Sequence, residues 1–309
     1  MNESKKSLTA EEEALFNKWL QQKKDFAENS IKECLEQVYP EKKAIHDVMN
    51  YAMYNGGKRL RPILVFEGAE IAGMELQKAV PAACALEMIH CYSLVHDDLP
   101  AMDDDDYRRG KLSCHKAFGE DMAILAGDAL LTGAFEVLAG AICYNDLERT
   151  RLLRVIGEIA LAAGSNGMIS GQVLDLKSED QNINQADLRE IHELKTGRLF
   201  VASLRAGAIL GGLDAESLEE LTLYAENFGL AFQITDDILD VIGNEQDMGK
   251  PIGSDEKSHK ATYPGLFGME KAQEMARESV INCIDNLRGF GTKADFLRYL
   301  AYYLLGRSN

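Results

Sequence analysis

Residues 81–110 read PAACALEMIHCYSLVHDDLPAMDDDDYRRG. The first part of this stretch is apolar on most sides, as expected for a helix buried inside a sizeable protein. It ends in Asp97 and Asp98, and four more aspartates follow at positions 103–106. Carboxylates this close together repel one another unless cations lie among them. The sequence therefore predicts a buried helix that carries a cluster of hard oxygen ligands at its end.

The balance of charges is strongly acidic. Among 309 residues, 33 are basic and 50 acidic, which gives a formal net charge of −17. Such a chain suits neither nucleic acid nor an anionic membrane surface, because both need Lys and Arg. The six cysteines are scattered without a CxxC pair, as is typical of a reducing compartment. No signal-peptide pattern or uninterrupted apolar window of roughly eighteen residues occurs, so we expect a cytoplasmic protein without membrane insertion.

Apolar residues recur at intervals of three and four over most of the chain, which predicts helices. Neither a βαβ pattern nor GxGxxG occurs. The helices are expected at residues 10–37, 41–55, 61–73, 78–99, 120–140, 147–165, 168–176, 185–211, 215–242, 270–287 and 293–305. Residues 103–119 and 243–265 are expected to form functional loops. The fold class is thus all-α, with a single domain over residues 1–309 in which residues 1–24 are expected to be peripheral or mobile.

A second carboxylate cluster lies in QITDDILDVIGN, residues 233–244. On a helix, its polar residues form one stripe between apolar flanks; they are Gln233, Asp236, Asp237, Asp240 and Asn244. Asp236 and Asp240 lie one turn apart and can share a divalent cation. An exposed helix face is one interpretation of the stripe, but its narrowness favours a face that lines an internal polar cavity.

Mg²⁺ fits the two clusters better than Ca²⁺ or Zn²⁺, with Mn²⁺ as an alternative. An EF-hand would need Gly and Glu at fixed positions, and the His and Cys spacing of a zinc site is absent. Mg²⁺ usually binds one or two carboxylates together with phosphate oxygens of a substrate. The partner of Asp97 stays open, because a straight helix would favour Asp104 whereas a bend at Pro100 would bring back Asp103.

Basic residues gather where turns are expected. They are Lys58, Arg59 and Arg61 in GGKRLRP, Arg108 and Arg109 after the aspartates, Lys195 and Arg198 in KTGR, and Lys250 and Lys260 in the late loop. Arg binds phosphate through paired N–H groups, and Lys acts as a mobile point charge. Each cluster alone is more typical of a solvated surface, but together they favour a polyphosphate site. His90, two turns before Asp97, is either a core side chain or a ligand contact.

Several of these motifs resemble those of the trans-isoprenyl diphosphate synthases. DDLPAMD at 97–103, followed by DDDYRRG, resembles the first aspartate-rich motif of that family, and DDILD at 236–240 resembles the second. Further blocks match in the same order: GGKRLRP at 56–62, GQVLDL at 171–176, KTGRLF at 195–200 and GKPIGSDEKSHKATYP at 249–264. The resemblance covers about residues 40–300 and is strongest to the bacterial members that make farnesyl diphosphate. It implies a prenyltransferase, usually a homodimer, built as an isoprenoid-synthase-type bundle of about ten helices around a central cavity.

The resemblance also implies roles for individual residues, with isopentenyl diphosphate and an allylic diphosphate as substrates and about three Mg²⁺ per site. Asp97 and Asp103 would bind two Mg²⁺ with support from Asp98, and Asp236 would hold the third. Arg108, Lys195 and Lys260 would contact the allylic diphosphate. Lys58, Arg61, His90 and Arg109 would hold isopentenyl diphosphate. Thr196 and Gln233 would lie beside the developing allylic cation, and Lys250 near its leaving group.

The resemblance further implies that product length depends on Tyr92 and Ser93, which lie five and four residues before Asp97. In that family a bulky aromatic side chain at the position of Tyr92 blocks the floor of the cavity and stops growth of the prenyl chain at farnesyl diphosphate. A smaller residue there allows geranylgeranyl diphosphate, so a geranylgeranyl diphosphate synthase is the alternative. Tyr92 could also be ordinary core packing, with the floor elsewhere.

Three other functions compete with this interpretation. A metal-dependent phosphohydrolase of the HD type would use His96 and Asp97 as its central pair, but it leaves the second aspartate motif without a task. A terpene cyclase usually carries one aspartate motif and a different second one. A non-catalytic helical subunit is disfavoured because both aspartate motifs are intact.

Overall fold

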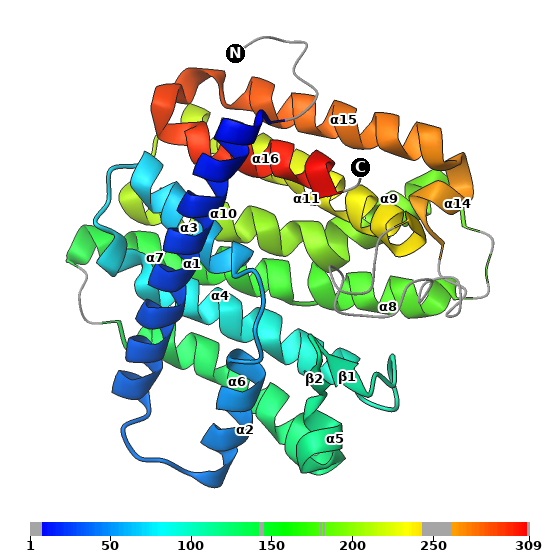
Figure 1. Ribbon diagram of the computed structural model, residues 1–309. Helices are drawn as coiled ribbons and strands as arrows, with labels where there is room; N and C mark the ends of the chain where they lie inside the picture. The colour runs from blue at the N-terminus through cyan, green and yellow to red at the C-terminus, as the bar shows by residue number, and fades with distance from the viewer. Residues whose placement is uncertain (1–7, 142–144, 180, 182, 243–260, 308–309) are drawn as a thin grey trace.

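The computed structural model describes residues 8–141, 145–179, 181, 183–242 and 261–307. Lys250, Lys260, Asn244 and most of the predicted loop at 243–265 lie outside these residues. Apart from one short hairpin, the described chain is helical or irregular, which confirms the all-α prediction (Figure 1). The larger helices are α1 (Ala10–Val38), α2 (Ala44–Met53), α3 (Leu60–Ile71), α4 (Leu76–Asp97), α6 (Glu120–Ala139), α7 (Asp146–Ala163), α8 (Met168–Ser178), α9 (Gln185–His192), α10 (Arg198–Gly211), α11 (Ala215–Ile242), α15 (Met269–Asn286) and α16 (Asp295–Arg307).

Local signals explain where several of these helices begin and end. Thr9 and Glu12 form a capping box at the start of α1, which satisfies amide groups that the helix leaves unbonded. Phe16 in this helix is fully buried and its ring lies 5.5 Å from that of Phe296, so α1 is not peripheral along its length, contrary to the sequence prediction. Helix α4 ends at Asp97, three residues before Pro100, which disfavours helical geometry in the residue that precedes it.

Three of the predicted elements are different in the structure. The loop expected at 103–119 contains a hairpin, in which β1 (Tyr107–Arg108) pairs antiparallel with β2 (Lys111–Leu112), and the short helix α5 (Cys114–Phe118). The helix expected at 185–211 is interrupted by a π-helical turn at Glu193–Gly197, called the π-turn below. A 3₁₀ segment, Arg288–Ala294, precedes α16, and the short helix α14 (Tyr263–Phe267) precedes α15.

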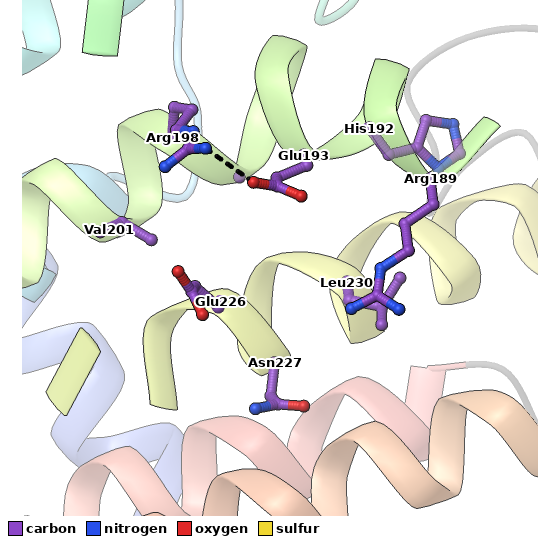
Figure 2. Close-up of a pocket in the computed structure, with 9 residues that line it drawn as sticks. Arg189, His192, Glu193, Arg198, Val201, Glu226, Asn227 and Leu230 are labelled. Atoms are coloured by element: carbon purple, nitrogen blue, oxygen red, sulfur yellow. Dashed lines mark ion pairs between the residues drawn. The ribbon is translucent and has the colours of Figure 1, made fainter. Parts of the chain in front are cut away.

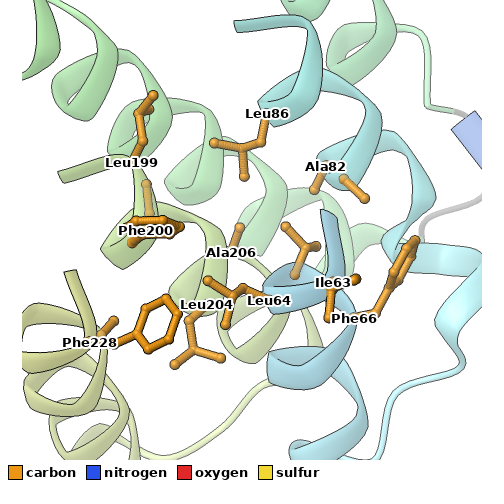
Figure 3. Packing of buried hydrophobic residues seen from close by; sticks show 14 of the residues in the cluster. Ile63, Leu64, Phe66, Ala82, Leu86, Leu199, Phe200, Leu204, Ala206 and Phe228 are labelled. Carbon is orange, nitrogen blue, oxygen red and sulfur yellow. The ribbon is translucent and has the colours of Figure 1, made fainter. Parts of the chain in front are cut away.

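The core lies where α3, α4, α10 and α11 pack together (Figure 3). Helices α3 and α10 approach so closely that a Cβ atom on Gly68 would lie 2.1 Å from the Leu204 carbonyl oxygen, and one on Gly207 would lie 1.8 Å from that of Val65. Glycine is therefore required on both sides of this crossing. Each large apolar side chain buried here, such as Phe228, contributes about 1.5–3 kcal/mol. This rigid centre holds the ends of α4 and α11 in fixed positions.

Two helical stretches are long and apolar enough to cross a membrane by length and composition alone, Glu120–Ala139 and Asp146–Ser178. The second is interrupted, because α7 ends at Ala163 and α8 begins at Met168. The first, α6, packs on α4, where a Cβ atom on Gly133 would lie 2.8 Å from the Met88 methyl carbon. A helix that packs into the core of a protein passes the same test, so it is weak evidence for a membrane span.

Candidate active site

The first aspartate motif is built on a backbone turn at the end of α4. The Asp103 amide donates a hydrogen bond to the Asp97 carbonyl oxygen at 2.9 Å, so the chain folds back after Pro100. Asp104 has a positive φ of 50°, and its amide bonds to the Leu99 carbonyl at 3.2 Å. The straight helix that would favour Asp104 is not formed. Of the two candidates, Asp103 is the one whose backbone returns to Asp97.

Asp98 faces inward from the same turn and is only 2% exposed. Its carboxylate accepts hydrogen bonds from Arg108 on β1, including one from Nε at 2.9 Å. Burial raises the pKa of Asp98, and the neighbouring guanidinium of Arg108 acts in the opposite direction. Arg108 also pairs with Asp105 at 3.0 Å. Asp98 therefore fixes the position of Arg108. The support of bound Mg²⁺ expected of Asp98 stays a prediction.

The basic residues of the GGKRLRP segment lie beside Arg109, the second arginine of the hairpin. Gly57 has a φ of +118°, and a Cβ atom there would lie 2.5 Å from Arg109 Nη1, so only glycine fits both the conformation and the space. Arg109 donates a hydrogen bond to the Gly56 carbonyl oxygen, and its Nη2 lies 3.5 Å from His90 Nε2. Burial, followed by the surrounding arginines, holds the pKa of His90 well below its usual value, so this imidazole is neutral.

A buried ion pair that the sequence analysis missed lies in this basic cluster. Arg59 begins α3 with a left-handed φ of 54° and is 5% exposed. Its Nη1 lies 2.6 Å from Glu87 Oε1, and its Nη2 donates to the Met53 carbonyl at 2.6 Å. Glu87 is 1% exposed, and its second carboxylate oxygen has no hydrogen-bond partner among the described residues. The only sequence signal was a glutamate inside the apolar run of α4.

The π-turn carries Lys195 and Thr196 toward the first aspartate motif. Lys195 Nζ lies 2.6 Å from Asp175 Oδ2 on α8 and 4.0 Å from Asp97 Oδ2. Asp175 lies in the GQVLDL block, for which the sequence had given no individual role. It holds the Lys195 ammonium beside Asp97. A π-turn inside a longer helical run is often found at functional sites.

The second aspartate motif divides between two faces of α11. Gln233 and Asp236 line a cavity, whereas the Asp237 carboxylate accepts a hydrogen bond from the Tyr263 amide of α14 at 2.9 Å. Asp240 is 3% exposed. The prediction of a single polar stripe is therefore correct for Gln233 and Asp236 and wrong for Asp237, which anchors a neighbouring helix.

This cavity, called the central cavity below, has a volume of about 410 Å³. It brings together eight predicted site residues from five parts of the chain: Lys58, Arg61, His90, Arg108, Arg109, Thr196, Gln233 and Asp236. Phe200 and Phe232 form an apolar wall, with ring centroids 5.2 Å apart. The Arg61 guanidinium lies over the Phe200 ring, 4.9 Å from its centroid, and burial lowers its pKa to about 10. Cationic and apolar surfaces thus adjoin, as a ligand with an anionic head and a hydrocarbon tail requires.

The residues expected to limit product length do not line this cavity. Tyr92 is 6% exposed, lies in the core, and has its ring centroid 5.8 Å from that of His96. The Ser93 hydroxyl donates a hydrogen bond to the His90 carbonyl at 2.9 Å. His96 Nε2 lies 3.2 Å from the Ile124 carbonyl oxygen of α6. This contact holds His96 against α6 and removes the observation that favoured an HD-type hydrolase.

The described residues contain no group of three or more His, Cys, Asp or Glu side chains arranged to hold a metal ion. The donors nevertheless fit Mg²⁺, which needs only one or two carboxylates when phosphate oxygens complete its shell. Asp97 is adjacent to Asp103 through the backbone, and Asp236 lines the cavity. These three carboxylates could hold Mg²⁺ together with a bound diphosphate.

Comparison with known proteins gives matches over nearly the whole chain. A family model described as polyprenyl synthetase matches residues 42–301. The dimethylallyltranstransferase of Fischerella ambigua (strain UTEX 1903) is 47% identical, over 96% of this chain and 86% of that protein. The farnesyl diphosphate synthase of Geobacillus stearothermophilus is 41% identical, over 94% of this chain and 97% of that protein. The chloroplastic heterodimeric geranylgeranyl pyrophosphate synthase large subunit 1 of Arabidopsis thaliana is 46% identical, over 86% of this chain and 72% of that protein. Among solved structures, an FPP/GFPP synthase from Zymomonas mobilis superposes with a TM-score of 0.82 at 36% identity, over 94% of this chain and 99% of that one.

Proposed function

The chain belongs to the polyprenyl synthetase family, and we propose that it condenses isopentenyl diphosphate with dimethylallyl or geranyl diphosphate to give farnesyl diphosphate and diphosphate. The observation that carries this proposal is the central cavity. It joins the base cluster of GGKRLRP and the hairpin to Asp236 of the second aspartate motif. Lys195, which precedes Thr196 of the cavity lining, lies 4.0 Å from Asp97. We propose that residues 1–309 form one polyprenyl synthetase domain.

The arrangement of the cations supports a proposal of two diphosphate subsites. Lys58, Arg61 and Arg109 lie together at the start of α3, and we assign them to isopentenyl diphosphate, with neutral His90 as a hydrogen-bonding neighbour. Arg108 and Lys195 lie beside Asp98 and Asp97, and we assign them to the allylic diphosphate. Two anionic groups are thereby bound at separate places, with their hydrocarbon parts between them.

Asp97, Asp103 and Asp236 would hold Mg²⁺, which when bound would neutralise diphosphate charge and make diphosphate a better leaving group. As the allylic carbon–oxygen bond breaks, the Thr196 hydroxyl and the Gln233 amide offer dipoles to the developing cation. Phe200 and Phe232 form an apolar wall that excludes water from this cation.

The double bond of isopentenyl diphosphate then attacks the cation, a carbon–carbon bond forms, and one proton leaves. Among the described residues that line the central cavity, Arg61 and Arg109 are cations and His90 adjoins them, so none of these three is suited to accept this proton. We assign the proton to the released diphosphate, which lies beside the new bond.

Product length is assigned to Tyr92, with Ser93 beside it. Tyr92 lies in the buried part of α4, and within the part of the chain that the structure describes its hydroxyl has no hydrogen-bond partner, as expected of a side chain kept for its bulk. Geranylgeranyl diphosphate is the second candidate product, favoured by the similarity to a geranylgeranyl pyrophosphate synthase subunit.

A homodimer in the cytoplasm belongs to the same proposal. Helices α6, α7 and α8 expose large apolar side chains that a second copy would cover; they are Ile124, Leu125, Leu153, Leu161, Ile169 and Val173. The five cysteines within the described residues are free, as expected in a reducing compartment.

Incubation of the purified protein with Mg²⁺, isopentenyl diphosphate and dimethylallyl diphosphate tests the proposal. We expect acid-labile prenyl diphosphate to accumulate, and EDTA to abolish its formation. Absence of condensation in the presence of Mg²⁺ would refute the proposed activity.

A further inference from the structure

The proposed function leaves the GQVLDL block, residues 171–176 of α8, without a task of its own. Gly171 and Asp175 in this block are four residues apart, so they lie on the same face of α8. A Cβ atom on Gly171 would lie 2.2 Å from the Lys195 amide nitrogen and 2.6 Å from Lys195 Cα. Only glycine therefore lets α8 touch the backbone of the π-turn at Lys195.

One turn further along α8, the Asp175 side chain meets the ammonium end of the same lysine. Asp175 Oδ2 accepts a hydrogen bond from Lys195 Nζ at 2.6 Å, whereas Asp97 Oδ2 lies 4.0 Å from that nitrogen. The side chains of the two aspartates are each 16% exposed and that of Lys195 is 25% exposed, so water screens these charges less than it would at the surface. One face of α8 thus holds Lys195 both at its backbone and at its charged end.

Other contacts fix the backbone of the π-turn as well. Glu193, which begins the turn, and Arg198, which follows it, form an ion pair at 2.8 Å, as the dashed line in Figure 2 marks. A Cβ atom on Gly229 of α11 would lie 3.1 Å from Gly197 Cα, so no side chain separates the turn from that helix. The Lys195 side chain, in contrast, has a flexible four-carbon stem, and the place of its ammonium group depends on what holds it.

We propose that Asp175 is a positioning residue, which holds the Lys195 ammonium group at the place where the allylic diphosphate binds. This inference rests on the proposed function, because it names a residue that serves the same site. Lys195 has three N–H donors, so it can keep its bond to Asp175 and donate to a diphosphate oxygen at the same time. Among the described residues, Asp97 is the other carboxylate within 4.0 Å of this ammonium group. Without Asp175, Lys195 would pair with Asp97, and a diphosphate would have to compete for it.

The direction of the effect separates positioning from simple charge repulsion. Asp175 is an anion near the place assigned to another anion, and like charges repel. If only its charge mattered, removal of Asp175 would strengthen diphosphate binding. If Asp175 keeps Lys195 in place, its removal weakens this binding. We expect the weakening, because the ammonium group at 2.6 Å already compensates the charge of Asp175.

Isothermal titration calorimetry of the full-length protein with geranyl diphosphate and Mg²⁺, in the absence of isopentenyl diphosphate, tests the proposal. We expect Asp175→Ala to weaken this binding about tenfold, and Asp175→Asn, which keeps an acceptor oxygen but no charge, to lie between that variant and the wild type. Isopentenyl diphosphate, titrated in the same way, should change its affinity less than about twofold. Asp25→Ala, the same change on the exposed face of α1, is the control and should alter neither affinity.

Lys195→Ala and the double variant with Asp175→Ala show whether the aspartate acts through the lysine. The double variant should bind geranyl diphosphate about as weakly as Lys195→Ala alone, because a residue that only positions another adds nothing once the other is gone. The proposal is overturned if Asp175→Ala, with its folding verified by circular dichroism, binds geranyl diphosphate as tightly as the wild type or more tightly. Effects of the two changes that multiply in the double variant would also overturn it.

Failure of this inference and failure of the proposed function give different results. If the wild type binds both diphosphates and Asp175→Ala binds them equally well, only the role of Asp175 is refuted. If the wild type binds both but does not condense them, the proposed function is refuted, whereas the calorimetric comparison of the Asp175 variants still holds. If the wild type binds neither diphosphate, both are refuted.

Discussion

Replacement of Glu87 by alanine is expected to destabilise the fold by about 3 kcal/mol. Removing one partner of a buried ion pair typically costs about 3–5 kcal/mol, because the other charge is left unpaired away from water. Both partners here are at most 5% exposed and lie 2.6 Å apart. Without Glu87, Arg59 would still have the Met53 carbonyl at 2.6 Å and the more exposed Glu28 at 3.3 Å as partners. The expected cost therefore lies at the lower end of this range of free energies.

Urea denaturation of Glu87→Ala, Arg59→Ala and the double variant measures this coupling. The effects should be non-additive, since each single change already breaks the pair. Glu28→Ala is the matched control, because Glu28 contacts the same guanidinium from a side chain that is 37% exposed, and it should cost no more than about 1 kcal/mol. Additive effects, or a Glu87→Ala cost no larger than that of Glu28→Ala, would refute the reasoning.

Three further outcomes are expected. Tyr92→Ala should lengthen the product, and chromatography of the dephosphorylated prenols would show an unchanged farnesyl chain if Tyr92 is not the floor. Gly57→Ala should raise the KM for isopentenyl diphosphate about tenfold, because the added Cβ atom would displace Arg109. Gly56→Ala is the control, since Gly56 also has a positive φ but a Cβ atom there would have nothing within 4 Å, and it should raise the KM less. Equal effects of the two changes would mean that backbone strain, and not the displacement of Arg109, is the cause. Because the pKa of His90 is held well below 6.5 in the free protein, a bound diphosphate should raise it and cause proton uptake below that pH. Calorimetry in buffers of different ionisation enthalpy should show this uptake in the wild type and less of it in His90→Gln.

Much of the fold could be predicted because it depends on apolar periodicity. Helix α11 spans the predicted residues 215–242, and α4 differs from its predicted range by two residues at each end. The aspartates at the ends of these helices and the bases in the turns are visible in the sequence as charge clusters. Their meeting in one cavity follows from the packing of α3, α4, α10 and α11, which the periodicity does not specify.

The residues that were missed act through partners distant in sequence. Glu87 looks like an isolated charge in an apolar helix until α3 brings Arg59 to it, 28 residues away. Asp175 gains its role only when α8 packs beside the π-turn and Lys195 reaches it. The π-turn itself has no signature in a helical pattern, because it adds a residue to one turn without changing the apolar character of the run.

The central claim is that the two aspartate motifs act as one site on a shared diphosphate. Rates of condensation for Asp97→Ala, Asp236→Ala and the double variant test it most directly, with circular dichroism to verify folding. If the claim is correct, each single change lowers kcat/KM at least about a hundredfold, and the double variant is little worse than the more severe single one, because residues that act as a unit are not additive. Effects that multiply in the double variant, or an Asp236→Ala rate close to that of the wild type, would contradict it.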